Sequence, residues 1–398
     1  MLINGIGKNH SDIINQIFAR ADKSNYFEIS PKIVPTAKSS KLTVRSKYAH
    51  LALAGKYFVL INPYYEYDAN PFEQYRDQIL EVTAQNNEIQ FEYDFKSEQM
   101  YRIMVAELLD TGYSLILTTF VYALDGDLFS LLPLIGDFHS HTIYSDGLED
   151  PKLVLESAIR QKLDFIAITD HNSYKGSVIG QICAKENNYP ITVINGEEYS
   201  STFTNMHIIS LGAKQPLPEA LYRFEAPETG HPLTAYQYIC QLVDHIRENG
   251  GISVMCHPLW KPFGSDGSRG DVPHSLVKEL MENKIFDAIE IVGGSPITDS
   301  MTSQMHYCWA VTYGATPDNT AYLGSTDAHR YSVDPISGKH FTVVFAKDHS
   351  QEAILDAVKN KMTVAVQIID DNNALCYGLP RYCMFAQFYV KEILNKVQ

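Results

Sequence analysis

Two histidines separated by one residue follow an apolar run and precede an acidic turn. His139 and His141 come after the run 131–135, and Asp146 lies in a Ser-Asp-Gly turn five residues later. On an extended strand, residues two apart point to the same face, so both imidazoles can reach one ion. Neutral imidazole and carboxylate are the usual ligands of zinc, manganese and iron. The pair alone is weak evidence, because ordinary strand histidines show the same spacing.

Five further clusters of the same residue types follow, each where a strand is predicted to end or begin. They are Thr169-Asp170-His171, Gly196-Glu197-Glu198, His207, Cys256-His257-Pro258 and Asp327-Ala328-His329. Buried polar groups must be paired, so six histidines and several acids at strand ends are hard to place in an ordinary core. We therefore interpret the clusters as parts of one metal site.

Residues 1–130 are predicted to form an antiparallel β-sandwich of the immunoglobulin type, preceded by a short helix. Apolar residues at helical spacing predict that helix over 9–21. Short runs rich in β-branched and aromatic residues then alternate with polar turns, at 41–47, 57–61, 88–93, 101–105 and 114–121. These strands carry no metal-type cluster, so we expect this domain to contribute no ligand.

Residues 131–398 are predicted to form a barrel of alternating strands and helices. Strands are predicted at 164–168, 190–194, 206–211, 252–255, 286–292, 322–324, 341–346 and 363–366. Helices are predicted from Pro151 and over 233–248, 274–283, 299–312 and 350–360. This alternation indicates a parallel sheet with helices outside, in which chemistry lies at the carboxyl ends of the strands.

The composition is that of a globular protein with an acidic surface. The 398 residues are 45% hydrophobic and 20% charged, with 32 Lys and Arg against 47 Asp and Glu and a formal net charge of −15. Such a surface repels polyanions, so we expect no binding to duplex nucleic acid. The sequence contains no run of about 18 apolar residues, so no membrane span is predicted. The start of the chain does not resemble a signal peptide and the six cysteines are scattered, so we expect a cytoplasmic protein.

The order of the motifs resembles that of the PHP family (polymerase and histidinol phosphatase). His-x-His, Ser-Asp-Gly, Thr-Asp-His, Gly-x-Glu, a single His, Cys-His-Pro and Asp-x-His follow one another between residues 134 and 366. The resemblance implies a distorted (β/α)7 barrel with a centre of manganese, iron or zinc, usually trinuclear, that hydrolyses phosphate esters. We therefore expect an α/β protein that holds two or three divalent ions.

The resemblance also implies which residues hold each ion. The first would be bound by His139, His141, Glu198 and Asp327, the second by Glu198, His207 and His257, and the third by Asp146, His171 and His329. Many relatives have histidine where this chain has Asp146, and either residue type can bind. Glu198 would bridge two ions, and a water between such ions is deprotonated at neutral pH.

Three more acids adjoin these ligands. We interpret Asp137 and Asp170 as acceptors that orient imidazoles, with direct binding to an ion as the less favoured alternative, and Asp170 is also a candidate catalytic residue. Glu197 precedes Glu198, but strand alternation turns it away, so we expect it to face solvent or make a structural bond.

Four cations are candidates for binding the substrate phosphate, although a solvated surface charge is the default for each. They are Arg330, Arg269, Lys261 and Lys175. Arg330 is favoured, because it directly follows the last predicted ligand, and we also expect it to act in catalysis. The proline-rich segment from Gln215 to Pro232 is either a lid over the site or an inert insertion.

The preferred function is hydrolysis of a small phosphomonoester, such as a nucleotide or a sugar or amino-alcohol phosphate. The alternatives are a phosphodiesterase acting on short oligonucleotides or nucleotide bisphosphates, a metal-dependent amide or lactone hydrolase, and a metal-loaded scaffold whose sandwich docks a partner. A Cys–His hydrolase built on Cys256 is weaker, because the sequence sets up no separate base or orienting residue for it. The sequence does not indicate the oligomeric state.

Overall fold

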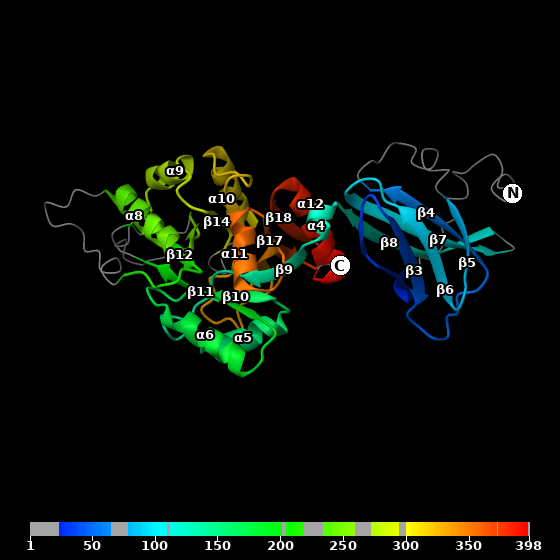
Figure 1. Ribbon diagram of the computed structural model, residues 1–398, viewed down its shortest axis with the longest axis horizontal. Coiled ribbons are helices and arrows are strands. Elements are labelled where there is room, and N and C mark those ends of the chain that lie inside the picture. The colour runs from blue at the N-terminus through cyan, green and yellow to red at the C-terminus, as the bar shows by residue number, and fades with distance from the viewer. Residues whose placement is uncertain are drawn as a thin grey trace. The chain divides into compact units, whose positions relative to one another are not determined.

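In the computed structural model the chain divides into two compact units (Figure 1). The first comprises Met1–Ser130 with Phe388–Asn395, and the second comprises Leu131–Gln387 with Lys396–Gln398. The structure describes residues 24–64, 79–109, 112–200, 204, 206–218, 234–258, 272–293, 300–371 and 373–396. The helix predicted over 9–21 lies outside these residues. Among the described helices, none has the length and apolar character needed to cross a membrane.

The first unit contains two β-sheets that share one hydrophobic core. One sheet has the order β1 (Phe27–Ser30), β3 (Ser39–Ser46), β6 (Glu88–Asp94). The other has the order β2 (Ile33–Pro35), β8 (Gly112–Leu124), β7 (Gln99–Leu109), β4 (Lys56–Pro63), β5 (Leu80–Thr83). Leu42 and Val44 of the first sheet are buried in the same cluster as Val59 and Ile103 of the second. Alternate residues of each strand thus face this core, as the sequence pattern predicts.

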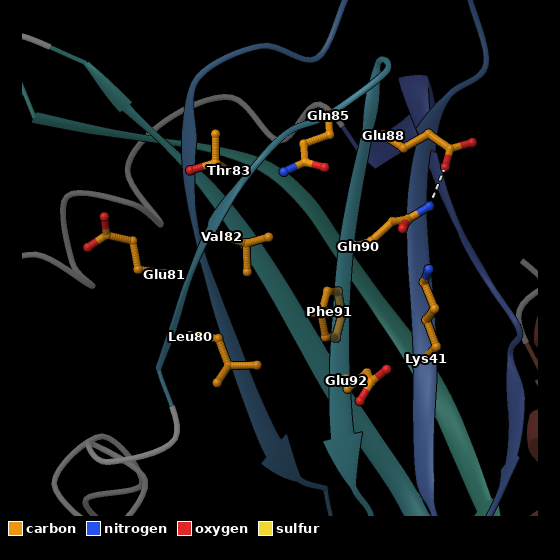
Figure 2. Close-up of a pocket in the computed structure, with 10 residues that line it drawn as sticks. All are labelled: Lys41, Leu80, Glu81, Val82, Thr83, Gln85, Glu88, Gln90, Phe91 and Glu92. Carbon is orange, nitrogen blue, oxygen red and sulfur yellow. Dashed lines mark hydrogen bonds between the residues drawn. The ribbon is translucent and has the colours of Figure 1, made fainter.

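Two features of this unit differ from a simple antiparallel arrangement. Strand β2 pairs with β8 in parallel. The chain reaches β2 from β1, which belongs to the other sheet, so no hairpin sets its direction. Strands β5 and β6 also belong to different sheets, and a pocket of about 550 Å³ is lined by residues that include Lys41, Val82 and Phe91 (Figure 2).

The second unit is an α/β domain organised around one ten-stranded sheet. The order is β15 (Ala321–Gly324), β14 (Ala288–Val292), β13 (Ile252–Met255), β12 (Ile208–Leu211), β11 (Thr192–Tyr199), β10 (Phe165–Ile168), β9 (Leu132–Asp137), β16 (His340–Ala346), β17 (Thr363–Asp370), β18 (Asn373–Gly378). The sheet curves until its parts nearly meet, because the Gly324 amide of β15 donates to Thr342 Oγ1 of β16 at 2.9 Å. The result is a nearly closed, barrel-like sheet.

Helices pack around these strands (Figure 1). They are α5 (Pro151–Arg160), α6 (Lys175–Glu186), α8 (Ala235–Glu248), α9 (His274–Glu282), α10 (Ser300–Thr312), α11 (Gln351–Lys359) and α12 (Pro380–Phe388). Side-chain caps fix several starts: Asp150 accepts from the Leu153 amide at α5, and Thr234 forms a capping box at α8. The short elements η1 (Ser24–Tyr26), α4 (Gly126–Phe129) and η3 (Tyr389–Ile393) complete the described helices.

Strand direction agrees with the sequence prediction only in part. Strands β9, β10 and β11 are parallel, as are β13, β14 and β15. Strand β12 runs antiparallel to both neighbours, and β16, β17 and β18 are antiparallel to their neighbours. Only residues 200–207 separate β11 from β12, and a parallel pair needs a longer crossover. The wholly parallel sheet expected from the strand–helix rhythm is therefore wrong at these strands.

Candidate metal centre

The segment that carries the first two histidines is tied to the loop that carries the last predicted ligands. After β9 ends, the His141 amide donates to the Ala328 carbonyl and the Asp327 amide donates to the His139 carbonyl, both at 3.0 Å. Ser140 Oγ also donates to the Ala167 carbonyl of β10 at 2.8 Å. These bonds join three separate parts of the chain where their strands end, which is why distant residues converge.

Four ligand atoms meet at one point inside this network. They are Nε2 of His139, Nε2 of His141, Oε2 of Glu198 and Oδ1 of Asp327. The two nitrogens are 3.1 Å apart, and each lies 2.9–3.2 Å from both oxygens. Ligands bound at about 2.0–2.2 Å to one ion are separated by about 3.0–3.5 Å, so these atoms already have the spacing of a coordination sphere.

This donor set fits a cation better than it fits hydrogen bonding. Glu198 Oε2 is buried and has no hydrogen-bond partner, although nitrogens of His139, His141 and His171 lie 3.0–3.2 Å away. His171 Nδ1 is buried without a hydrogen bond as well. Leaving buried polar atoms unpaired is costly, and a cation at their common centre would satisfy them. The residues present therefore fit the divalent ions expected from the sequence.

The electrostatics of the cluster are those of ionised acids among histidines. Burial lowers the pKa of His141, but the carboxylates of Asp327 and Glu198 outweigh burial and raise it to about 9. The same balance raises the pKa of His139 well above its usual value. Burial raises the pKa of Glu198, yet His139 and His207 hold it well below the ordinary range. Since a ligand histidine must be deprotonated, ion binding here displaces protons.

Glu198 connects this group to the neighbouring histidines. Its Oε2 faces the first group, while its Oε1 lies 2.8 Å from His207 Nδ1 and 3.4 Å from His257 Nε2. His207 groups most closely with Glu198 and His171, whereas His257 groups with His139 and Glu290. His207 and His257 both face the same Glu198 oxygen, so their assignment to a second ion stays a prediction.

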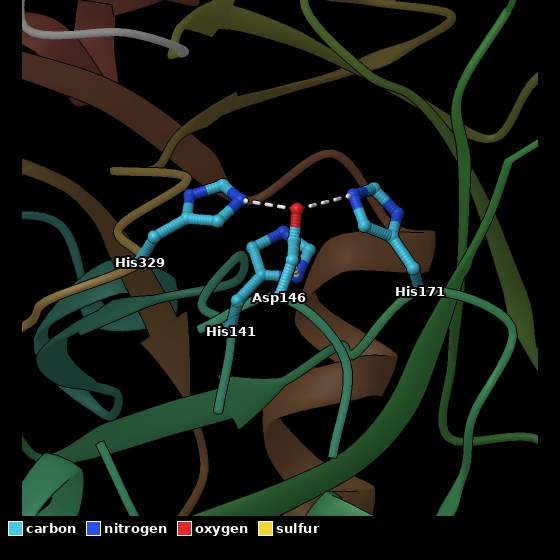
Figure 3. Close-up of side chains that lie close together, drawn as sticks. All are labelled: His141, Asp146, His171 and His329. Carbon is cyan, nitrogen blue, oxygen red and sulfur yellow. Dashed lines mark ion pairs between the residues drawn. The ribbon is translucent and has the colours of Figure 1, made fainter. Parts of the chain in front are cut away.

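A third group is centred on Asp146 (Figure 3). The Asp146 carboxylate lies between two rings, with Oδ2 3.2 Å from His329 Nε2 and 3.6 Å from His171 Nε2, and the His141 ring is beside it. Burial raises the pKa of Asp146, but the neighbouring His329 and His171 lower it by more. The side chain of Asp146 is 55% exposed, so this is the part of the site that solvent reaches. All nine predicted ligands therefore lie in these adjoining groups.

The acids beside the ligands have other partners than those expected. Asp137 accepts from the His139 amide, from the Thr326 amide and hydroxyl, and from the Tyr331 hydroxyl at 2.6–3.1 Å. Burial raises the pKa of Asp137 to about 7. The prediction that Asp137 orients an imidazole is wrong, because its buried carboxylate is used by backbone and hydroxyl donors that fix the loops.

Asp170 likewise holds a loop rather than a ring. Its carboxylate accepts from the Thr142 amide and hydroxyl, both at 2.7 Å, and from Ser145 Oγ at 2.8 Å. These donors flank the turn that carries Asp146, so the prediction that Asp170 orients an imidazole is also wrong. The helix α6 packs directly behind it, since a Cβ on Gly176 would lie 1.8 Å from Asp170 Oδ2.

Two other predicted neighbours lie in the interior. Glu197 is buried and accepts from the Leu217 amide at 2.6 Å, which is the structural bond that strand alternation allowed. Cys256 is also buried, and burial raises its thiol pKa well above the usual value, with the charge of Glu290 adding to the effect. A neutral buried thiol is a poor nucleophile, so this geometry gives no support to a Cys–His hydrolase.

The predicted phosphate-binding cations are only partly visible. Arg330 is exposed and directly follows the ligand His329. Lys175 is exposed at the start of α6, with its ammonium 4.7 Å from the centre of the Tyr144 ring. Lys261 and Arg269 lie outside the described residues, as does most of the segment from Gln215 to Pro232.

Glu290 is a buried acid beside the ligands that the sequence analysis missed. It lies within β14, with Oε1 2.8 Å from His139 Nδ1 and Oε2 2.9 Å from the His257 amide nitrogen. His306 is a buried neighbour that interacts electrostatically with Glu290, and burial lowers the pKa of His306 to about 4. The sequence does contain a signal for it, because Glu290 is an acid inside the apolar run 288–292. A search limited to strand ends does not find a residue in the middle of a strand.

The fold and the site together define an α/β protein with adjoining groups of histidines and acids that could hold metal ions. Residues 137–259 match the PHP domain family, which confirms the resemblance drawn from the motifs. This stretch begins at the last residue of β9 and contains seven of the nine predicted ligands, from His139 to His257.

Curated relatives match the chain over shorter stretches than the whole. An uncharacterized protein of Methanocaldococcus jannaschii is 29% identical over 134 residues, which cover 31% of this chain and 67% of that protein. The 5'-3' exoribonuclease Rnm of Salmonella typhimurium is 31% identical over 98 residues, covering 24% of this chain and only 33% of the exoribonuclease. Among solved structures, a two-domain protein of Bacteroides vulgatus containing a predicted PHP-like metal-dependent phosphoesterase is 20% identical with a TM-score of 0.45, covering 59% of this chain and 65% of that one.

Proposed function

We propose that the second unit is a metal-dependent phosphoesterase that hydrolyses a small phosphomonoester at a centre of two or three divalent ions, manganese, iron or zinc. The observation that carries the proposal is the convergence of His139, His141, Glu198 and Asp327. The two histidine nitrogens lie 3.1 Å apart and 2.9–3.2 Å from both carboxylate oxygens, and the Glu198 oxygen has no hydrogen bond. Such ions, when bound, supply a hydroxide at neutral pH and neutralise charge on phosphate oxygens.

The protein's own groups have distinct tasks in this proposal. The two oxygens of Glu198 face different histidines, with Oε2 close to His141 and Oε1 close to His207, so Glu198 would bridge two ions. Asp170 positions the turn with Asp146 through its bonds to Thr142 and Ser145, and the catalytic role expected of it from the sequence stays a prediction. Arg330, which follows His329 in the chain, and Lys175, whose ammonium lies over the Tyr144 ring, are exposed cations that would bind phosphate oxygens.

The finer architecture is part of the same proposal. We assign residues 131–398 to a (β/α)7 barrel of the PHP type, in which β16, β17 and β18 form an antiparallel extension. We assign residues 1–130 to an immunoglobulin-like sandwich, supported by two sheets on one core. The four metal-type groups found among the described residues all belong to the second unit.

The experiment is a phosphate-release screen on the full chain. The protein is stripped with a chelator, reloaded with Mn²⁺, Fe²⁺ or Zn²⁺, and tested on nucleoside, sugar and amino-alcohol monophosphates. We expect release only after reloading, inhibition by inorganic phosphate, and no binding to duplex DNA at low salt. Asp327→Asn should abolish release, because a neutral amide binds a divalent ion far more weakly than a carboxylate does, while Asp287→Asn, away from the ligands, should not. A metal-loaded protein that turns over no ester would refute the proposal and favour a binding scaffold.

A second candidate is a phosphodiesterase acting on short oligonucleotides or nucleotide bisphosphates. The similarity to a relative named as a 5'-3' exoribonuclease favours it. The net charge of −15 argues only against long polyanions, so a short oligonucleotide is compatible with it. Comparing release of nucleotides from dinucleotides with release of phosphate from the matching monophosphate separates the two functions.

A further inference from the structure

The carboxylate of Glu290 links two predicted ligands on the side of the centre away from solvent. It is fully buried in β14, between the apolar residues Ile289 and Ile291. One oxygen lies 2.8 Å from His139 Nδ1, and the other accepts from the His257 amide at 2.9 Å. Its two oxygens therefore contact two segments of the chain, one after β9 and one after β13.

The contact with His139 determines which ring nitrogen is free. A carboxylate only accepts, so Nδ1 must carry the proton that it donates to Glu290. The opposite nitrogen, Nε2, then has its lone pair exposed in the neutral ring, and this is the atom 3.1–3.2 Å from His141, Glu198 and Asp327. Glu290 thus selects the tautomer of His139 that can bind an ion.

The contact with His257 holds an unusual backbone. His257 has φ = 21°, a positive value that residues other than glycine rarely adopt. The bond from its amide to Glu290 fixes this turn just after β13, where the ring reaches Glu198. Gly293 lies close to the carboxylate, since a Cβ there would be 3.1 Å from Glu290 Oε2.

We propose that Glu290 is a positioning residue of the metal centre, which sets the tautomer of His139 and the backbone of His257 through a single carboxylate. This inference rests on the proposed metal centre. Glutamine is the informative replacement, because it has the same shape but one acceptor and one donor group. If its oxygen accepts from the His257 amide, its amino group faces His139 Nδ1 and favours the tautomer with the proton on Nε2, where it blocks the ion.

The test is a titration of the chelator-stripped full chain with Zn²⁺ alone, monitored by calorimetry. Glu290→Gln should weaken zinc binding by about 10–100-fold, the range typical of residues that orient ligand histidines. The matched control is Asp287→Asn, the same change on the segment leading into β14, where the carboxylate accepts from Ser253 and Arg247 instead. The control should bind zinc as the unaltered protein does.

A spectroscopic measurement separates positioning from a general loss of packing. In zinc-loaded protein with ¹⁵N-labelled histidine, His139 should show a protonated Nδ1 that exchanges slowly with water, and Glu290→Gln should lose this signal. Glu290→Asp, shorter by one methylene, reaches only one of the two donors and should also weaken binding, so it replaces the glutamine variant if that one does not fold.

The outcomes distinguish this inference from the proposed function. If the unaltered protein binds none of Zn²⁺, Mn²⁺ and Fe²⁺, both are wrong. If it binds zinc and the Glu290 variants bind within about twofold of it with the Nδ1 signal retained, the centre exists and only the role of Glu290 is refuted.

Discussion

Replacing Glu198 by glutamine tests whether one carboxylate joins the groups of ligands. Its Oε2 lies 3.0–3.2 Å from nitrogens of His139, His141 and His171, and its Oε1 lies 2.8 Å from His207. Glutamine keeps the shape but exchanges one oxygen for an amino group that cannot bind a cation. Whichever way the amide turns, an amino group replaces one of the two oxygens that would bind an ion.

The expected effect exceeds that of changing a residue that only orients a ligand. Such residues alter metal affinity by about 10–100-fold, so a lost ligand should weaken at least one ion by about 100-fold or more, which corresponds to about 2.7 kcal/mol. Turnover should fall almost completely, because water activation needs the bridged ions. The fold should survive, because glutamine fills the same buried space without a change in volume.

Metal content measured by mass spectrometry, zinc calorimetry and phosphate release form the assay, with thermal unfolding of the stripped protein as the check on folding. Glu197→Gln is the matched control, because Glu197 is the adjacent buried acid in β11 and bonds to the Leu217 amide. Full ion content and turnover in Glu198→Gln would refute the bridging role. Loss of ions in the Glu197 variant alone would move that role to the neighbouring acid.

Three further outcomes follow from other contacts. Arg330→Ala should raise KM or lower kcat by about tenfold without changing metal content, and unchanged kinetics would remove this arginine from substrate binding. Burial holds the pKa of His340 at about 4 in the folded protein, against 6.5 in the unfolded chain. The contribution of neutral His340 to the free energy of unfolding is therefore complete above pH 6.5 and is lost as the pH falls toward 4. In urea unfolding, His340→Gln should therefore reduce the loss between pH 7 and 5 by about 2 kcal/mol, and an unchanged slope would contradict this. Gly176→Ala should destabilise the protein by about 1–3 kcal/mol, because its Cβ would lie 1.8 Å from Asp170 Oδ2, whereas Gly126→Ala, with open space, should not.

The ligand positions were open to prediction because of how each is encoded. His171, Glu198 and His257 come at or just after the end of an apolar strand. The carboxyl ends of neighbouring parallel strands lie along one edge, so chemistry-bearing residues placed there must approach one another. Residue type and position were enough to predict that these residues gather, and the structure places all nine within adjoining groups.

The contacts of the neighbouring acids were not open to the same reasoning. Asp137 and Asp170 adjoin ligand histidines in the chain, yet their carboxylates bond Thr326 and Thr142, which come from other loops. Adjacency in sequence says little about which donors surround a buried carboxylate. Glu290 was missed for the converse reason, since its partner His139 is 151 residues away.

The sequence by itself determined the classes of element, the ligand types and their places at strand ends, because hydrophobic periodicity and residue chemistry are local properties. Tertiary structure alone decided the direction of β12 and of β16 to β18, and which histidines face each oxygen of Glu198. Strand direction depends on how each connection crosses the sheet, and ligand grouping depends on ring orientation within distances of about 3 Å. Both are set by contacts between segments that lie far apart in the chain, and no local pattern records them.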